Sequence, residues 1–273
     1  MIISEALNNI SNWLLQQTQN NVILQIDFML EEFYYPEQIL PEELDHLLAQ
    51  GWYRMGQSLF TTDYVLFDER IYPAIWLRND LNQYREGKTI QKLRKRNQAF
   101  QIRFQQARIT PEHEWLYRQY QKGIPFLVSS SVHQLLLGYG LGEQDLFNTY
   151  EISIIHNNHL IASSYFDIGA NSAEGISAFY HPAYRTCSLG KYMIYLQIQV
   201  CHGNGLRWYY PGYFVPGYKH LDYKLDIGTE CLSYFDKKDL QWHGIEKYNG
   251  QGVSLDMRNF MQQYFPQFPQ EGL

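Results

Sequence analysis

Apolar side chains in the first part of the chain change from a helical spacing to a strand-like one. After Ser4, apolar residues at every third or fourth position predict an amphipathic helix near the N-terminus. Pro41 and the two glutamates after it predict a second, short helix, because proline fits the first turn and acids favour the N-terminal end of the helix dipole. Short aromatic and β-branched runs then predict strands over residues 58–60, 64–67 and 71–77.

The middle of the chain predicts alternating helices and strands. Residues 89–98 have a helical pattern, residues 100–104 read as a strand, and Thr110 followed by proline and glutamate is typical of a helix start. The pattern of apolar and polar residues changes after this helix start. We therefore expect a smaller α+β N-terminal domain over residues 1–110 and a second domain over residues 111–273.

The second half predicts a sheet interrupted by one long helix. Residues 150–155 and 159–166 form a hairpin pattern around an Asn-Asn turn, and residues 175–180 form a third strand. A helix follows from Ser188 to about residue 202, and the remaining elements are a strand over residues 206–210 and an amphipathic helix over roughly residues 254–264. This order resembles an acyltransferase (GNAT-like) domain with a mixed sheet, and the fold class is α+β.

Composition narrows the class of protein. The 273 residues are 45% apolar, yet no run of 18 apolar residues occurs, so we expect no membrane-spanning segment. The first residues lack the basic and apolar regions of a secretory signal. The three cysteines are too scattered for a disulfide framework and fit a reducing compartment. We therefore expect a cytoplasmic protein.

Positive charge is concentrated in one segment. The formal net charge is −6, but residues 85–108 contain eight basic residues and one acidic residue, a local charge of +7. Such a segment is either a local anion-binding site or a solvated helix face, and composition leaves both open.

Two blocks in the second half carry recognisable motifs. The first runs from Ser177 to Tyr184 and continues through Ser188-Leu189-Gly190-Lys191; the second joins Tyr210-Pro211-Gly212-Tyr213 to residues 219–224. Both resemble motifs of the arginyl- and leucyl-tRNA–protein transferases. In that family a stretch ending in Asp/His-Pro-x-Tyr leads to Ser-Leu-Gly-Lys, and a Tyr-x-Gly-Tyr stretch leads to Lys-Met-x-Tyr-Lys.

Three further matches precede these blocks, in family order. Asp167 interrupts an apolar strand where the family has Val-x-Asp-x-Leu, residues 51–56 resemble Gly-Phe-Arg-Arg-Ser-Gly, and residues 88–97 resemble the family's basic stretch. Together the matches span most of residues 44–224. The chain therefore resembles the aminoacyl-tRNA–protein transferase family.

Cysteines mark the main departure from that family. The family has a Cys-x-x-Cys after its Arg-Arg-Ser-Gly stretch, which in some members is linked to an iron–sulfur cluster or haem. Here residues 61–68 contain no cysteine, and Arg-Arg-Ser-Gly has become Tyr53-Arg54-Met55-Gly56. We therefore expect no metal and no cofactor.

The resemblance implies transfer of an amino acid from its tRNA ester to the N-terminal α-amine of a protein, a modification of the N-degron type. The expected partners are aminoacyl-tRNA and a protein with an acidic N-terminus. The ester is already activated, so the site must align both substrates, keep the amine unprotonated and stabilise an oxyanion. An amine with a pKa of about 8 needs only a modest push, which the Asp167 carboxylate can supply. Alternatively, Asp167 caps the turn after its strand.

Other residues receive roles on the same basis. The helix start at Ser188 suits a phosphate or an oxyanion, unless Ser188 is an ordinary N-cap. The predicted catalytic residues are Asp167, Tyr180 and Ser188. The predicted tRNA-binding residues are Lys88, Lys92, Arg94, Lys95, Arg96, Lys191, Lys219 and Lys224. The predicted pocket for the aminoacyl group and the acceptor end contains Ser177, Tyr210 and Tyr213, and the tyrosines among all these residues either stack on bases or pack in the core.

Two other functions stay open at this point. A coenzyme-A-dependent N-acetyltransferase has a similar topology, but residues 185–190 contain a single glycine where such enzymes have a glycine-rich pyrophosphate loop. A catalytically silent tRNA- or degron-binding homologue is the other alternative, since the family cysteines are missing. The sequence also leaves open whether the donor amino acid is arginine or leucine.

Overall fold

The structure, a computed structural model, describes residues 32–67, 70–124, 128–138, 145–250, 254–256, 259–260 and 262. Its helices are α2 (Pro41–Ala49), α3 (Lys88–Asn97), α4 (Pro111–Gln121), α5 (Val132–Leu137) and α6 (Leu189–Gly203). Short 3₁₀ helices are η1 (Pro182–Cys187), η2 (Lys219–Asp226), η3 (Thr229–Cys231) and η4 (Ile245–Lys247). The first strands are β1 (Glu32–Tyr34), β2 (Tyr53–Met55), β3 (Ser58–Thr61), β4 (Tyr64–Phe67), β5 (Arg70–Pro73), β6 (Ile75–Asp80) and β7 (Gln101–Gln106). The later strands are β8 (Thr149–His156), β9 (His159–Ile168), β10 (Ser172–Tyr180), β11 (Trp208–Phe214), β12 (Leu232–Asp236), β13 (Gln241–Gly244) and β14 (Leu255–Asp256).

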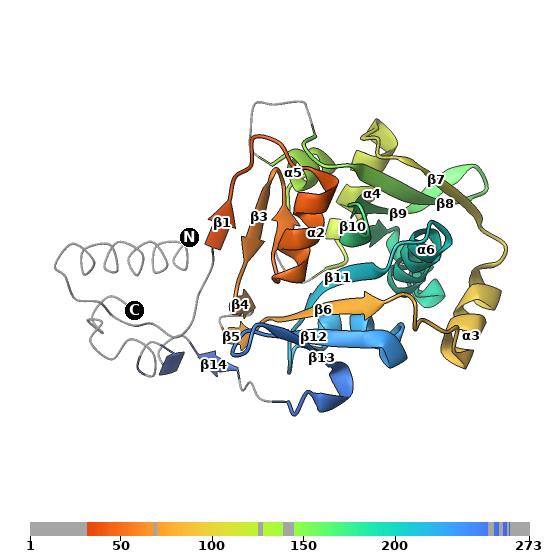
Figure 1. Ribbon diagram of the computed structural model, residues 1–273. Coiled ribbons are helices and arrows are strands. Elements are labelled where there is room, and N and C mark those ends of the chain that lie inside the picture. The colour runs from red at the N-terminus through yellow and green to blue at the C-terminus, as the bar shows by residue number, and fades with distance from the viewer. Residues whose placement is uncertain are drawn as a thin grey trace.

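The largest sheet in the described part of the chain has eight strands in the order β13-β12-β6-β11-β10-β9-β8-β7 (Figure 1). Its paired strands are antiparallel except β10 and β11, which run parallel because α6 connects them. Two three-stranded sheets, β1-β3-β2 and β14-β5-β4, accompany it. The predicted α+β class with a mixed sheet is confirmed.

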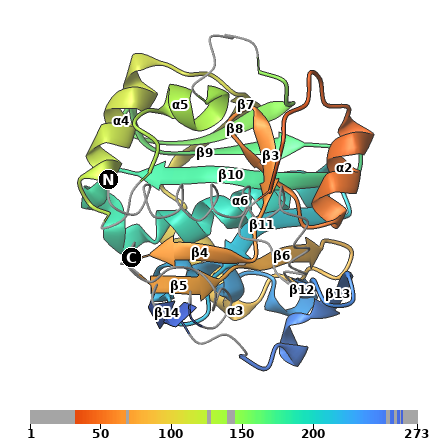
Figure 2. The ribbon, with the colours of Figure 1, turned by 90° about the vertical axis from the view of Figure 1, so that its left-hand side faces the viewer.

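Helices cover both faces of the large sheet. Tyr209 and Tyr210 are successive residues of β11, so their rings point to opposite faces. Tyr209 lies in a core formed with α3 and α6, whereas Tyr210 lies in a core formed with α2 and the β1-β3-β2 sheet. Helices α4 and α5 pack over β9 and β10 on the Tyr210 side. Figure 2 looks onto this second face, with α6 behind the sheet.

Most of the predicted elements are confirmed where the structure describes the chain. The Thr110 side chain caps α4 by accepting from the His113 N–H. Asn157 and Asn158 have φ angles of 51° and 62°, the left-handed pair that a tight two-residue hairpin turn requires. Among the described residues no helix is both long and apolar enough to cross a bilayer.

Some local predictions were wrong. The strand predicted over residues 71–77 is two strands in two sheets, because the chain changes partners after Ala74. The Ala74 N–H still bonds to the Asp63 main-chain oxygen in line with the β4–β5 ladder, whereas residues from Ile75 on pair with β11 and β12. Residues 255–256 form a strand and not the start of a helix, whereas residues 259–260 and 262 are helical. The other residues of 257–264 and the predicted N-terminal helix lie outside the described residues.

Strands from both sides of the predicted domain boundary share the large sheet. β6 and β7 precede residue 110, yet β6 lies between β12 and β11, and β7 pairs with β8. The division into residues 1–110 and 111–273 stays a prediction.

Candidate active site

A pocket of about 1270 Å³ opens where the two parallel strands separate. β10 and β11 pair only as far as Glu174 and Tyr210. The next residues of each strand, 175–177 and 211–213, line the pocket from its two sides. Both strands have an irregular register at this point, as strands commonly do where a site is built.

Two glycines make the separation possible. A Cβ at Gly175 would lie 2.6 Å from the Tyr209 hydroxyl, inside contact distance. Gly212 has a φ of +87°, a left-handed conformation that side chains rarely adopt. Side chains at these positions would therefore strain the pocket wall.

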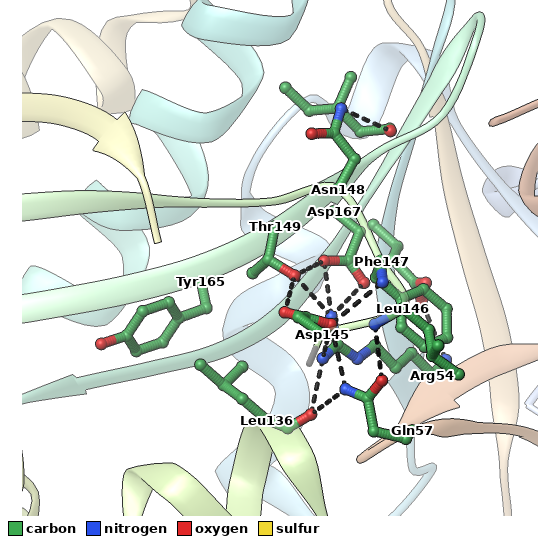
Figure 3. Close-up of polar contacts among 12 residues, drawn as sticks. Arg54, Gln57, Leu136, Asp145, Leu146, Phe147, Asn148, Thr149, Tyr165 and Asp167 are labelled. Atoms are coloured by element: carbon green, nitrogen blue, oxygen red, sulfur yellow. Dashed lines mark hydrogen bonds and ion pairs between the residues drawn. The ribbon is translucent and has the colours of Figure 1, made fainter. Parts of the chain in front are cut away.

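A buried arginine holds one wall of the pocket. The Arg54 guanidinium lies 2.8 and 2.9 Å from the two carboxylate oxygens of Asp167, and neither side chain is exposed to solvent (Figure 3). It also donates to Thr149 Oγ1, to the main-chain oxygens of Gly56 and Leu136, and to Asp145. All five of its N–H groups are therefore used, which offsets much of the cost of burying the charge.

A second buried carboxyl lies beside this ion pair. Glu174 is opposite Asp167 across β9 and β10, is fully buried, and accepts from the Arg54 main-chain N–H at 3.0 Å. Burial, opposed by Arg54, raises the pKa of Asp167, while burial and the charge of Asp167 raise the pKa of Glu174 well above its ordinary value. Glu174, which lacks the guanidinium contact, is thus the more readily protonated of the two carboxyls.

The three side chains of Tyr53-Arg54-Met55 have different surroundings. Tyr53 lies at the base of the pocket, Arg54 lies in the buried network, and Met55 is exposed to solvent. The Tyr53 hydroxyl donates to the main-chain oxygen of Gly175 and lies 3.1 Å from that of Tyr210, at the base of the separation. The sequence marked this segment only as an altered motif and did not identify Arg54 as the partner of Asp167. Nothing in the sequence pattern singled out Glu174 or Asp145.

The structure brings together some of the predicted site residues and not others. Ser177, Tyr213 and Lys224 line the pocket. Tyr210 does not, because its ring is buried and packs edge-on against Trp242. Asp167 lies behind the pocket wall, and its carboxylate contacts Arg54 and Thr149. Its role as a base stays a prediction.

The start of α6 lies beside the basic helix α3. Gly190 is next to the ring of Tyr180. Ser188 has a left-handed backbone and its side chain caps nothing; its hydroxyl accepts instead from Arg96 at 3.1 Å. Lys191 forms an ion pair with Asp226 of η2. Ordinary N-capping by Ser188, the alternative left open by the sequence, is therefore wrong.

Helix α3 presents its cations to solvent. Ile90 and Leu93 are buried and anchor the helix on α6, while all five of its basic side chains are exposed: Lys88, Lys92, Arg94, Lys95 and Arg96. Arg94 pairs with Glu86. Lys219 is also exposed, on η2.

One group among the described residues has the spacing of a cation site. Ligand atoms of Asp236, Asp239 and His243 lie within 4.8 Å of one another on the β12–β13 hairpin. None of them lines the pocket, and the imidazole already contacts the Asp239 carboxylate at 2.8 Å. This contact accounts for the group without a metal.

Comparison with known proteins finds a family model and relatives that match this chain. Residues 98–233 match the family described as arginine-tRNA-protein transferase, C terminus. The aspartate/glutamate leucyltransferase of Leptospira interrogans is 27% identical over 201 residues, which cover 71% of this chain and 76% of that protein. The enzyme of the same name from Helicobacter hepaticus is 26% identical, with coverages of 70% and 79%.

Solved structures with a similar arrangement are distant. FemX is 10% identical, with a TM-score of 0.40 over 96% of this chain and 79% of its own. L-PGS from Bacillus licheniformis is 14% identical, with a TM-score of 0.37 over 75% of this chain, which spans about half (56%) of that solved chain. The ribosomal-protein-S18-alanine N-acetyltransferase of Escherichia coli has a TM-score of 0.29. None of these likenesses bears on the chemistry.

The buried pair generates a prediction about stability. Asp167→Leu leaves the Arg54 guanidinium without its main partner and should cost about 3–5 kcal/mol of unfolding free energy. The double variant Arg54→Met, Asp167→Leu removes both charges and should be more stable than the single variant, as measured by urea unfolding. Arg94→Met, which breaks an exposed pair, is the control. A double variant as unstable as the sum of both single variants would contradict the pairing.

The raised pKa of Glu174 generates a prediction about pH. Because the native state binds this proton more tightly than the unfolded chain, its contribution to stability is present below the ordinary value of 4.5 and is lost as pH rises through the native pKa. Glu174→Gln removes that loss. Its unfolding midpoint relative to wild type should therefore be higher at pH 8 than at pH 5, whereas the exposed control Glu37→Gln should show no such trend. Equal differences at both pH values would rule out a protonated Glu174.

Proposed function

Since this chain belongs to the aminoacyl-tRNA–protein transferase family, we propose that it transfers leucine from leucyl-tRNA to proteins that begin with aspartate or glutamate. The names of its relatives support both leucine as the transferred amino acid and aspartate or glutamate as the first residue of the acceptor. The reaction forms a bond between the amine nitrogen and the ester carbonyl carbon, and the ester C–O bond breaks. The proton that the amine loses ends on the ribose oxygen of the released tRNA. The product is a modified N-terminus of the N-degron type.

The lining of the pocket is the observation that favours leucine over arginine. Its described residues include no aspartate or glutamate, and they include apolar side chains such as Leu135, Leu137 and Ile176. A guanidinium enclosed in such a pocket would lack a carboxylate partner, which is costly. A leucine side chain needs only apolar contact.

The chemistry requires alignment more than it requires a strong base. An α-amine has an ordinary pKa of about 8, so a useful fraction is already unprotonated near neutral pH. We therefore assign Asp167 a positioning role: it fixes Arg54, and Arg54 holds the wall at Gly56 and Leu136. Ser177 and Tyr213 then flank the space in which ester and amine meet.

The remaining predicted residues form a track for the tRNA acceptor end. Exposed α3 cations would hold phosphates of the acceptor stem by counterion release. The contact between Arg96 and Ser188 joins this helix to the start of α6, where Gly190 is next to the Tyr180 ring. The centre of that ring lies 5.9 Å from the ring centre of Tyr120, which lines the pocket. Lys191 stands at the start of α6 and Lys219 at the start of η2.

The donor assignment is tested by crossing leucyl-tRNA and arginyl-tRNA with peptides that differ only in the first residue. Transfer of labelled leucine to peptides beginning with Asp or Glu should exceed transfer of arginine by at least about tenfold, because the pocket offers a guanidinium no partner. Mass measurement of the peptide identifies the added residue. Preferred transfer of arginine would overturn the leucine assignment, and absence of any transfer would overturn the proposed activity.

The α3 assignment is tested through the dependence of tRNA binding on salt. Lys88, Lys92 and Lys95 follow one another at helical spacing on one face, and no ion pair is recorded for them among the described residues. Changing all three to Gln should weaken tRNA binding and lower the salt slope by about 2–3, roughly one for each phosphate contact. The matched control changes three exposed lysines elsewhere, Lys122, Lys238 and Lys247. Equal slopes for the two triple variants would place the tRNA on another surface.

A further inference from the structure

Lys224 occupies an unusual position in the pocket. It comes from η2, which packs against β11 and α6, and its Nζ reaches over the separated end of β11. Nζ donates to the main-chain oxygen of Tyr213 at 2.8 Å and lies 5.3 Å from the centre of the Tyr213 ring. A Cβ at Gly212 would come within 3.1 Å of Nζ, so the absence of a side chain there leaves room for the ammonium.

The two cations of the pocket differ in how their charge is balanced. Arg54 is neutralised by Asp167 and Asp145. Lys224 is half-buried and forms no ion pair with any residue in the described part of the chain; a carbonyl and a ring are the contacts recorded for its Nζ. Burial lowers its pKa to about 8, which reflects a charge held without a carboxylate.

A partly buried ammonium of this kind is completed by an anion from outside. Lysine has three N–H donors, and the Tyr213 oxygen takes one, so two are left for a ligand. The described lining of the pocket provides no carboxylate. The ligand that brings one is the first residue of an acidic acceptor.

We propose that Lys224 binds the side-chain carboxylate of the acceptor's first residue and thereby selects aspartate and glutamate over neutral residues. This inference rests on the proposed function and reassigns a residue that the sequence suggested for tRNA. The position of Lys224 in the pocket favours the peptide over tRNA as its ligand. In the proposed function, the exposed lysines of α3 bind the tRNA phosphates. An ammonium at this depth discriminates strongly, since an acidic side chain without it would be left unpaired.

The test compares Lys224→Met with wild type on peptides that begin with Asp, Glu, Asn and Gln. Wild type should favour Asp over Asn. In the Met variant kcat/KM for the Asp peptide should fall by about 100-fold or more, mainly through KM, while the Asn peptide changes little, so that the preference disappears. Lys224→Arg keeps the charge and should retain part of the preference. Lys238→Met, an exposed lysine outside the pocket, is the matched control.

Two further measurements keep the outcomes separate. Calorimetric binding of the Asp and Asn peptides to wild type and to both Lys224 variants reads the selectivity without any transfer, and thermal unfolding identifies a variant that does not fold. An equal loss on all peptides, accompanied by weaker tRNA binding, would mean that Lys224 holds a tRNA phosphate and would overturn the inference. An unchanged Asp-to-Asn ratio in the Met variant would also overturn it. Inactive wild type that still binds Asp peptides through Lys224 would instead contradict only the proposed function.

Discussion

The buried ion pair between Arg54 and Asp167 is the interaction on which the candidate site depends. It joins β2 to β9 in a region that excludes water, and the same guanidinium also bonds to the end of α5 and to the segment before β8. A buried ion pair alone is a poor source of stability, because desolvation consumes most of the attraction. Its value here is positional. Five fixed donors place four separate segments around one point.

That point lies beside the separation of β10 from β11, so the network and the pocket form one unit. The parallel strands separate because both have irregular registers and glycines where side chains would collide. Tyr53 connects the two features, since its hydroxyl bonds to the main chain of β10 and its neighbour in sequence is Arg54. The two cations of the pocket also differ in their partners. Arg54 forms ion pairs within the fold, whereas Lys224 lines the pocket and forms no ion pair among the described residues.

The basic helix reaches the same site by a different route. The buried Ile90 and Leu93 of α3 fix it to α6, and the Arg96 contact with Ser188 joins it to the first residues of that helix. Because the Ser188 hydroxyl is occupied by Arg96, the first N–H groups of α6 receive no side-chain cap from it. In the proposed function, the exposed cations of α3 bind phosphates of the tRNA acceptor stem beside this junction. The pocket binds the aminoacyl group.

The sequence by itself determined the local elements and the family. Helical spacing, the Thr110 cap and the Asn157-Asn158 turn depend on interactions within a few residues, so pattern alone specified them. Ordered motifs over residues 44–224 likewise pointed to the transferase family without knowledge of the fold. The sequence also marked Ser177, Tyr213 and Lys224, three residues that line the pocket.

Only the tertiary structure decided which partners those residues contact and which of them line the pocket. The sequence suggested Asp167 as a base for the amine or as a turn cap, but its partner Arg54 is 113 residues away, and no local pattern encodes that pairing. Tyr210 and Tyr213 look alike in the motif, yet strand alternation and the bend at Gly212 bury the first and place the second in the pocket. Glu174 and Asp145 gave no signal, because burial and neighbouring charge, which set their roles, are properties of the assembled sheet.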